Sequence, residues 1–277
     1  MTGLGYVPGA TALRETMLFR RLRHRMSLLV DERTNSHFTG FLRLPTQFEA
    51  LAGPVMSMLA SRPAAPGRLA IAVLGCSNGA EAFTISSVLR RHHPALAFGI
   101  RGFDIDGTIV EQARRACYSS DEIYNNKIIT DDFVEHTFDR VDGAYRVKAH
   151  IAERATFEVG DVLDRALADV VGPCDLVFAQ NFLFHLKRDM ARTALDNIAR
   201  LMRSGSILFA DGVDLDLRTA FVRKHGLVPV AFGIQRIHDE ARRARAIGWP
   251  NEYWGLEPFL TTRRDWKTRY ATIFLMP

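Results

Sequence analysis

Short apolar runs alternate with segments of helical periodicity along most of the chain. From residue 68 onward, runs rich in valine, isoleucine and leucine are followed by stretches in which apolar residues recur every three or four positions. This alternation is typical of βαβ units, which form a mostly parallel sheet with helices on both faces. It predicts a doubly wound α/β fold with strands at 69–74, 98–103, 156–159, 175–179, 206–210 and 271–276 and helices at about 79–92, 107–117 and 189–202. We expect the last strand at the edge of the sheet or next to it.

The N-terminal part of the chain does not follow this alternation. Residues 11–30 carry leucines and methionines at helical spacing among arginines, which predicts an amphipathic basic helix. Its arginines form either a solvated face or a docking face for an acidic partner. The sequence Ser-Arg-Pro-Ala-Ala-Pro-Gly at 61–67 then interrupts the chain. We therefore expect a short N-terminal helical cap and linker at 1–67 and a main domain at 68–277.

Two segments of the main domain depart from the strand and helix rhythm. Between about 118 and 155 the alternation stops, and Val-Asp-Gly-Ala-Tyr-Arg-Val-Lys at 141–148 predicts a small inserted hairpin. This insertion either helps to choose a ligand or is purely structural. The segment at about 236–270 is dense in aromatic residues, including Trp249, Trp254 and Trp266. It forms either a lid or pocket for a flat ligand, or a tail packed across the sheet.

Composition narrows the class of protein. The chain has 277 residues, 47% hydrophobic and 24% charged, and no apolar run approaches the roughly 20 residues of a membrane span. Its 3 cysteines are too few and too scattered for a disulfide framework or a metal site. The net charge of +5 is modest and forms no dense basic stripe, so we expect no nucleic-acid partner. A cytoplasmic protein without a metal is expected, and its oligomeric state stays open.

The most informative pattern follows the first predicted strand. Ile-Ala-Val-Leu at 71–74 leads into Gly-Cys-Ser-Asn-Gly-Ala-Glu at 75–81, a tight turn that opens a helix. Glycines let the backbone approach a ligand, and the free N–H groups of the helix start point toward it. The second strand ends in Asp104-Ile105-Asp106, where a βαβ unit places a carboxylate for a ribose. These signals indicate a nucleotide-type cofactor. A dehydrogenase is disfavoured because 75–81 lacks the full glycine spacing of a dinucleotide loop.

These motifs together resemble one family. The chain is similar to the CheR-type chemotaxis receptor glutamate methyltransferases at four motifs. These motifs are Thr-Asn-Ser-His-Phe-Thr-Gly-Phe-Leu-Arg at 34–43, the loop at 75–81, Asp-Ile-Asp at 104–106 and Asn-Phe-Leu-Phe-His at 181–185. The likeness extends over about residues 33–211. It implies a class I methyltransferase fold, which is Rossmann-like, and S-adenosylmethionine as cofactor.

The resemblance also implies a set of cofactor-binding residues. Gly75, Ser77 and Gly79 would shape the loop around the methionine part of the cofactor, and Glu81 would lie near its amino group. Asp104 would take the ribose hydroxyls with Ile105 beside it, and Asp161 and Val162 would lie at the adenine edge. Asn181 and Phe182 would line the site beside the sulfonium, and Asn35 and Thr39 would close the site from above. The alternative for each residue is an ordinary turn, helix cap or solvated carboxylate.

Two side chains are candidates for catalysis. Methyl transfer is an in-line displacement, so the protein mainly aligns the acceptor and excludes water. A carboxylate acceptor is already ionised at neutral pH, and Arg43, where the resemblance places the family's active-site arginine, would clamp it. His185 stands where the family has a tyrosine, and it either accepts a proton from a hydroxyl, amine or imidazole acceptor or only holds the acceptor. Gln180 replaces an arginine of the family.

The departures from the family favour an acceptor that is not a receptor glutamate. Besides His185 and Gln180, the family's N-terminal receptor-docking domain looks shortened, and the likeness fades after Asp211. We therefore expect an S-adenosylmethionine-dependent methyltransferase acting on a small molecule or another non-receptor acceptor. A protein-glutamate carboxyl methyltransferase and a non-catalytic cofactor-binding regulator stay open as alternatives.

Overall fold

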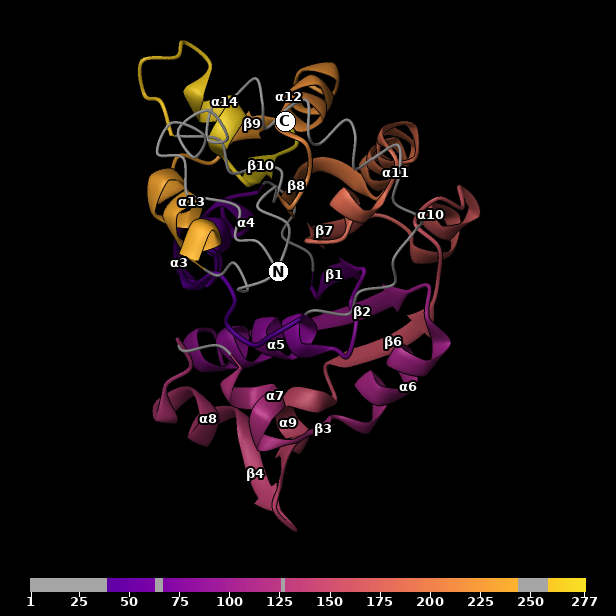
Figure 1. The fold of residues 1–277 in the computed structure, drawn as a ribbon, viewed down its shortest axis with the longest axis vertical. Coiled ribbons are helices and arrows are strands. Elements are labelled where there is room, and N and C mark those ends of the chain that lie inside the picture. Colours follow the sequence, from indigo (N-terminus) through magenta and orange to yellow (C-terminus); the bar gives the residue numbers. More distant parts are fainter. Residues whose placement is uncertain (1–38, 63–66, 126–127, 244–258) are drawn as a thin grey trace, which may run out of the picture.

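A twisted, mostly parallel sheet forms the centre of the molecule (Figure 1). The computed structural model describes residues 39–62, 67–125, 128–243 and 259–277. Within these ranges, the main sheet has 7 strands in the order β6-β2-β1-β7-β8-β10-β9. Their bounds are β1 (Leu69–Leu74), β2 (Phe98–Asp104), β6 (Ala155–Val159), β7 (Cys174–Gln180), β8 (Met202–Asp211), β9 (Val228–Pro229) and β10 (Ile273–Leu275). The predicted doubly wound, mostly parallel α/β fold is confirmed.

Strand β10 is the penultimate strand of the sheet. The sequence had predicted that this last strand would lie either at the edge or next to it. It pairs antiparallel with β8 on one side and with the short strand β9 on the other. The five neighbouring strands β6, β2, β1, β7 and β8 pair with one another in parallel. Strand β9 was not predicted from the sequence, because a two-residue strand carries no periodicity.

Helices cover both faces of this sheet. One apolar cluster joins alternate strand residues such as Ile71 and Phe178 to helices on one face, and a second cluster joins Ala72 and Val177 to helices on the other. The first face packs against α3 (Pro45–Ala50), the π-helical turn η1 (Leu51–Val55), α4 (Met56–Ala60), α5 (Ala80–His92), α6 (Gly107–Arg115) and α13 (Ile234–Arg243). The second packs against α10 (Ala166–Val171), α11 (Arg188–Arg200), α12 (Leu215–Lys224) and α14 (Trp266–Tyr270). Because β1 is buried on both sides, it reads as a continuous apolar run.

The inserted segment, residues 117–152, is more than the predicted hairpin. The hairpin is present, and its turn places Asp142 and Gly143 at φ of 51° and 80°, which suits a tight two-residue turn. A third strand and short helices accompany it on the side of α5 away from the main sheet (Figure 1). The elements are β3 (Cys117–Tyr118), α7 (Ser120–Tyr124), α8 (Asp131–Thr137), β4 (Phe138–Val141), β5 (Ala144–Val147) and α9 (Ala149–Ala152).

Arg62, at the start of the stretch 61–67, forms a salt bridge with the main sheet. Arg62 Nη1 and Arg203 Nη2 each lie 2.6 Å from Asp175 Oδ1, and the Ala70 backbone N–H donates to Oδ2 at 2.9 Å. Burial opposes ionisation of Asp175, but these donors together hold its pKa below the usual range. The division of the chain at residue 67 stays a prediction, and the predicted basic helix at 11–30 lies outside the described residues.

The aromatic C-terminal segment packs against the second face of the sheet where it is described. Phe259 lies 4.7 Å from Tyr270 and 5.9 Å from Trp266, measured between ring centroids. All three belong to or flank the apolar cluster of that face, which agrees with the tail packed across the sheet. Residues 244–258, including Trp249 and Trp254, lie outside the described part. Among the helices of the described ranges, none is both long and apolar enough to cross a membrane.

Candidate functional site

A cavity opens at the carboxyl ends of β1, β2, β6 and β7. Most of the residues predicted for the site line it: Thr39, Arg43, Gly75, Ser77, Glu81, Asp104, Ile105, Asp161, Val162, Asn181, Phe182 and His185. They come from segments far apart in sequence, and the parallel strands bring them together because all their carboxyl ends meet at one edge. Gly79 does not line the cavity, and Asn35 lies outside the described residues.

Backbone conformations that favour glycine shape the loop after β1. Gly75 has φ of +64°, and a Cβ there would lie 2.7 Å from the Phe182 ring, so only glycine fits. Ser77, at φ of +49°, adopts the left-handed region without being glycine. Gly79 precedes α5 at φ of +87° and packs toward Phe157. Gly79 thus helps to shape the loop without lining the cavity, and its predicted part in cofactor binding stays a prediction.

Asp104 ties this loop to the end of β2. Its Oδ2 accepts from the Ser77 backbone N–H at 2.8 Å, and its Oδ1 accepts from the Asp106 N–H at 3.1 Å. The residue is 8% exposed and lines the cavity. A carboxylate can accept about four hydrogen bonds, so each oxygen keeps capacity for a ribose hydroxyl.

The loop after β6 is held by a residue that the sequence did not indicate. Asn197 Nδ2 on α11 donates to the backbone oxygens of Val162 at 2.9 Å and Leu163 at 3.1 Å. Asp161 Oδ1 accepts from the Leu163 N–H at 2.9 Å and closes an Asx turn. The loop backbone is thus fixed where Asp161 and Val162 meet the cavity. An asparagine inside a helix carries no signal for this role, because its partners are 34 and 35 residues away.

Glu81 is a cavity carboxyl whose pKa is strongly perturbed. It lies in the first turn of α5, and removal from water raises its pKa to about 8, against the opposing effect of the Arg43 guanidinium. At neutral pH most molecules of the ligand-free protein therefore carry a neutral Glu81. An ammonium group bound beside this carboxyl would favour its ionised form.

The short segment 39–44 carries Arg43 to the cavity in a strained conformation. Leu42 has φ of +47°, which is unusual for a bulky residue, and its backbone N–H lies 3.4 Å from Thr84 Oγ1. Just beyond it, the Thr46 hydroxyl donates to Glu240 at 2.5 Å and its N–H donates to the same carboxylate at 3.1 Å. Glu240 on α13 thus holds the start of α3, although 194 residues separate it from Thr46.

The segment after β7 brings His185 to the cavity. Asn181, at φ of +59°, donates its backbone N–H to the Asp211 oxygen at 3.0 Å. His185 ends the short 3-10 helix η2 (Leu183–His185), half-buried, with its ring centroid 3.9 Å from that of Phe184. These contacts direct the predicted catalytic histidine toward the same cavity as Arg43.

Two buried polar atoms of the cavity-lining residues have no hydrogen-bond partner within the described ranges. They are Gln180 Nε2 and Ser77 Oγ, on residues that are each 8% exposed. Buried polar groups are nearly always hydrogen-bonded in folded proteins. Unsatisfied groups at a cavity wall are therefore what a site for a polar ligand presents before the ligand binds.

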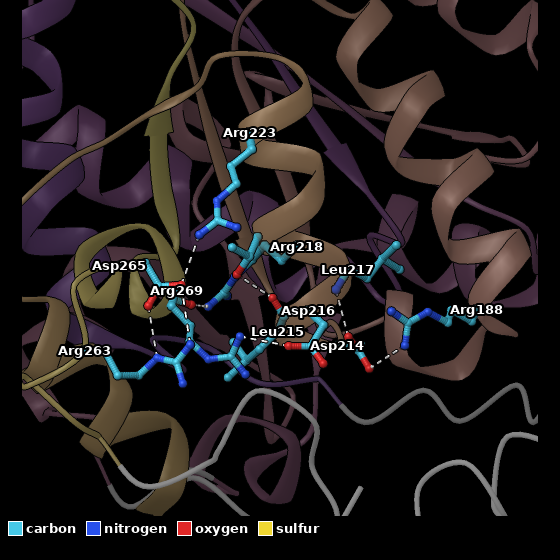
Figure 2. A network of polar contacts seen from close by, with 11 residues as sticks. Arg188, Asp214, Leu215, Asp216, Leu217, Arg218, Arg223, Arg263, Asp265 and Arg269 are labelled. Atoms are coloured by element: carbon cyan, nitrogen blue, oxygen red, sulfur yellow. Dashed lines mark hydrogen bonds and ion pairs between the residues drawn. The ribbon is translucent and has the colours of Figure 1, made fainter.

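A network of arginines and aspartates lies at the end of β8 (Figure 2). The segment after β7, which carries His185, is hydrogen-bonded to this end of β8. Arg218, 2% exposed, donates to the backbone oxygens of Ala210 at 3.1 Å and Arg269 at 2.9 Å, and lies 3.6 Å from Asp211. Asp214 accepts from the Leu217 N–H at 2.8 Å and so caps α12. The network fixes residues 210–214, to which the backbones of Asn181 and Phe184 are hydrogen-bonded.

Comparison with known families identifies the domain. The model of the CheR methyltransferase SAM-binding domain matches residues 37–214. The chain belongs to this family. The predictions of a CheR-type methyltransferase and of S-adenosylmethionine as its cofactor are therefore confirmed. The roles of individual residues stay predictions.

Named relatives are longer than this chain. It is 30% identical over 172 residues to the probable biofilm formation methyltransferase WspC of Pseudomonas putida, covering 62% of this chain and 40% of WspC. It is 27% identical over 176 residues to chemotaxis protein methyltransferase 2 of Vibrio cholerae, covering 62% of this chain and 59% of that protein. The chain thus spans less than two thirds of these relatives. Among solved structures, magnesium protoporphyrin IX methyltransferase of Synechocystis PCC 6803 matches with 15% identity and a TM-score of 0.39 over 83% of this chain and 90% of that one.

Proposed function

We propose that this protein transfers a methyl group from S-adenosylmethionine to an acceptor other than a chemotaxis receptor, bound at Arg43 and His185. The observation that carries the proposal is the convergence of the predicted cofactor and catalytic residues on one cavity. The cavity also fits the cofactor chemically. It offers Gly75 at positive φ in the loop after β1, the Asp104 carboxylate as an acceptor for ribose hydroxyls and the Glu81 carboxyl as a partner for an ammonium group.

The residues present can carry the transfer without a metal. When bound, S-adenosylmethionine supplies a methyl group on a positively charged sulfur. In the transfer, the acceptor atom would bond to this methyl carbon as the carbon–sulfur bond breaks, with the electron pair left on sulfur. Arg43 would hold an anionic or polar acceptor in line, and His185 would take the proton that a hydroxyl or amine acceptor loses. With cofactor and acceptor bound, the walls of the cavity would shield the reacting atoms from water.

His185 and Gln180 favour a non-receptor acceptor. A histidine is able to accept a proton near neutral pH, which a carboxylate acceptor does not require. The Gln180 amide brings a neutral donor, where the resembling family has a charged arginine. Both side chains line the cavity with Arg43. An acceptor with a titratable hydroxyl, amine or imidazole group suits this set best.

Carboxyl methylation of a protein glutamate is the second candidate. Arg43 favours it, because its guanidinium lines the cavity and can hold a carboxylate by two parallel hydrogen bonds. The chemotaxis methyltransferase among the named relatives favours it as well.

One assay separates these candidates. The purified protein is incubated with methyl-labelled S-adenosylmethionine and fractionated cell extract, and the products are then treated with mild alkali. Stable label in small molecules supports the proposal, whereas label that leaves the protein fraction as methanol supports glutamate esterification. Arg43→Ala tests the site, with Arg115→Ala at an exposed position as the matched control. Cofactor binding without label in any fraction contradicts both functions and supports a non-catalytic regulator.

A further inference from the structure

The segment that carries Arg43 is anchored in the inserted segment rather than in the main sheet alone. Phe41 is 1% exposed, and its ring lies 4.9 Å from that of Tyr118 and 5.0 Å from that of Phe138, both edge to face. The Phe133 ring lies 6.3 Å away. These partners belong to β3, β4 and α8, and aromatic pairs of this geometry are each worth about 0.5–1.5 kcal/mol beyond area burial.

A second contact joins the inserted segment to the same loop. Asn125, which follows α7, donates from Nδ2 to the backbone oxygen of Thr39 at 3.2 Å. Its Oδ1 lies 3.0 Å from the position that a Cβ on Gly40 would occupy. The asparagine side chain therefore lies directly against the loop backbone, and Thr39 is a lining residue of the cavity.

The loop between these anchors needs external support. Leu42 is held at φ of +47°, a left-handed conformation that costs an L-residue about 1–2 kcal/mol. Such strain persists only where the surroundings determine the backbone. Phe41 on one side and Leu44 on the other, 1% and 2% exposed, are both in the apolar core. Arg43 is thus presented to the cavity because its neighbours are buried.

We propose that Phe41 and Asn125 are positioning residues, through which the inserted segment holds Arg43 at the cofactor cavity. The inference rests on the proposed function, because placing Arg43 matters only where a cofactor and an acceptor bind. It gives the insertion a role in the site although, among the described residues that line the cavity, none comes from 117–152.

Glu81 provides a readout that requires no acceptor. The Arg43 guanidinium lowers the Glu81 pKa, so a loop that carries Arg43 away from the cavity lets that pKa rise. S-adenosylhomocysteine has the ammonium group of the cofactor and does not react, so its affinity between pH 6 and 8.5 reports the Glu81 titration. Calorimetry would measure this affinity for wild type, Phe41→Leu, Asn125→Ala and Arg43→Ala.

We expect both Phe41→Leu and Asn125→Ala to shift the titration upward by about half a unit to one unit, which weakens binding at pH 7 about 3- to 10-fold. In an Arg43→Ala background, neither substitution should weaken binding further, because the Arg43 charge that lowers the Glu81 pKa is already absent.

Tyr145→Leu is the matched control for lost packing. Tyr145 is 6% exposed in the same aromatic group, and its ring lies 6.1 Å from Phe138. It should lower the melting temperature as Phe41→Leu does, without moving the titration. Should Phe41→Leu fail to fold, the exposed Asn125→Ala variant still decides the question. Folded variants with the wild-type titration, or losses that persist without Arg43, overturn the inference. A wild type that binds no S-adenosylhomocysteine overturns the proposed function as well.

Discussion

The protonation of Glu81 makes a quantitative prediction about cofactor binding. Its pKa of about 8 in the ligand-free protein means that roughly one molecule in ten is ionised at pH 7. A ligand ammonium pairs with the ionised carboxylate only. Binding at pH 7 therefore includes the cost of removing this proton, about 1.4 kcal/mol or a tenfold loss of affinity. We expect the affinity for S-adenosylhomocysteine to rise about tenfold per pH unit between pH 6 and 7.5.

Isothermal titration calorimetry in two buffers of different ionisation enthalpy tests this directly. The wild type should release most of one proton per bound ligand at pH 7, because Glu81 changes from mostly neutral to ionised. Glu81→Gln should release almost none from this position, and its affinity should be nearly independent of pH. The exposed Glu135→Gln is the control and should behave as wild type.

Substitutions distinguish the effect of Glu81 on binding from the effects of other titratable groups of the cavity. Asp104, Asp161 and His185 line the same cavity, and histidines titrate in the same pH range. The measurement is therefore repeated in His185→Phe, where the Glu81 effect should persist. A wild-type affinity that does not change between pH 6 and 7.5, with no proton released, would refute the reasoning, since Glu81 then would not ionise on binding.

Three further predictions concern other parts of the structure. Arg43→Ala and His185→Phe should reduce methyl transfer by at least about 100-fold while cofactor affinity stays within about tenfold, as followed by label transfer and calorimetry. Gly75→Ala, whose Cβ would meet the Phe182 ring at 2.7 Å, should destabilise the fold by about 1–3 kcal/mol and weaken cofactor binding, while Gly107→Ala, with its first contact at 3.6 Å, should not. Asp175→Asn should lower the free energy of unfolding by about 2–3 kcal/mol in urea titrations at pH 7. Because the folded-state pKa of Asp175 is depressed, the wild type should lose this advantage as the pH falls below about 4, and the two proteins should then converge.

Local patterns along the chain were enough to predict the strands and the cofactor loop. The run at 69–74 is apolar at every position because β1 is buried on both faces, and Gly75 follows at the point where the backbone needs positive φ. Asp104 ends the neighbouring strand, so parallel pairing brings it to this loop. Such features depend on residues close in sequence and on the common direction of parallel strands. They could therefore be inferred without coordinates.

The tertiary structure alone decided how the catalytic candidates are held. Phe41 meets the rings of Tyr118 and Phe138, and Thr46 is bound by Glu240, 194 residues away. Gly79 packs toward Phe157, which is also far from it in sequence. Partners of this kind are chosen by the folded shape, which brings together groups that have no relation in sequence. A buried polar or aromatic side chain gains its energy only from the neighbour that it meets after folding.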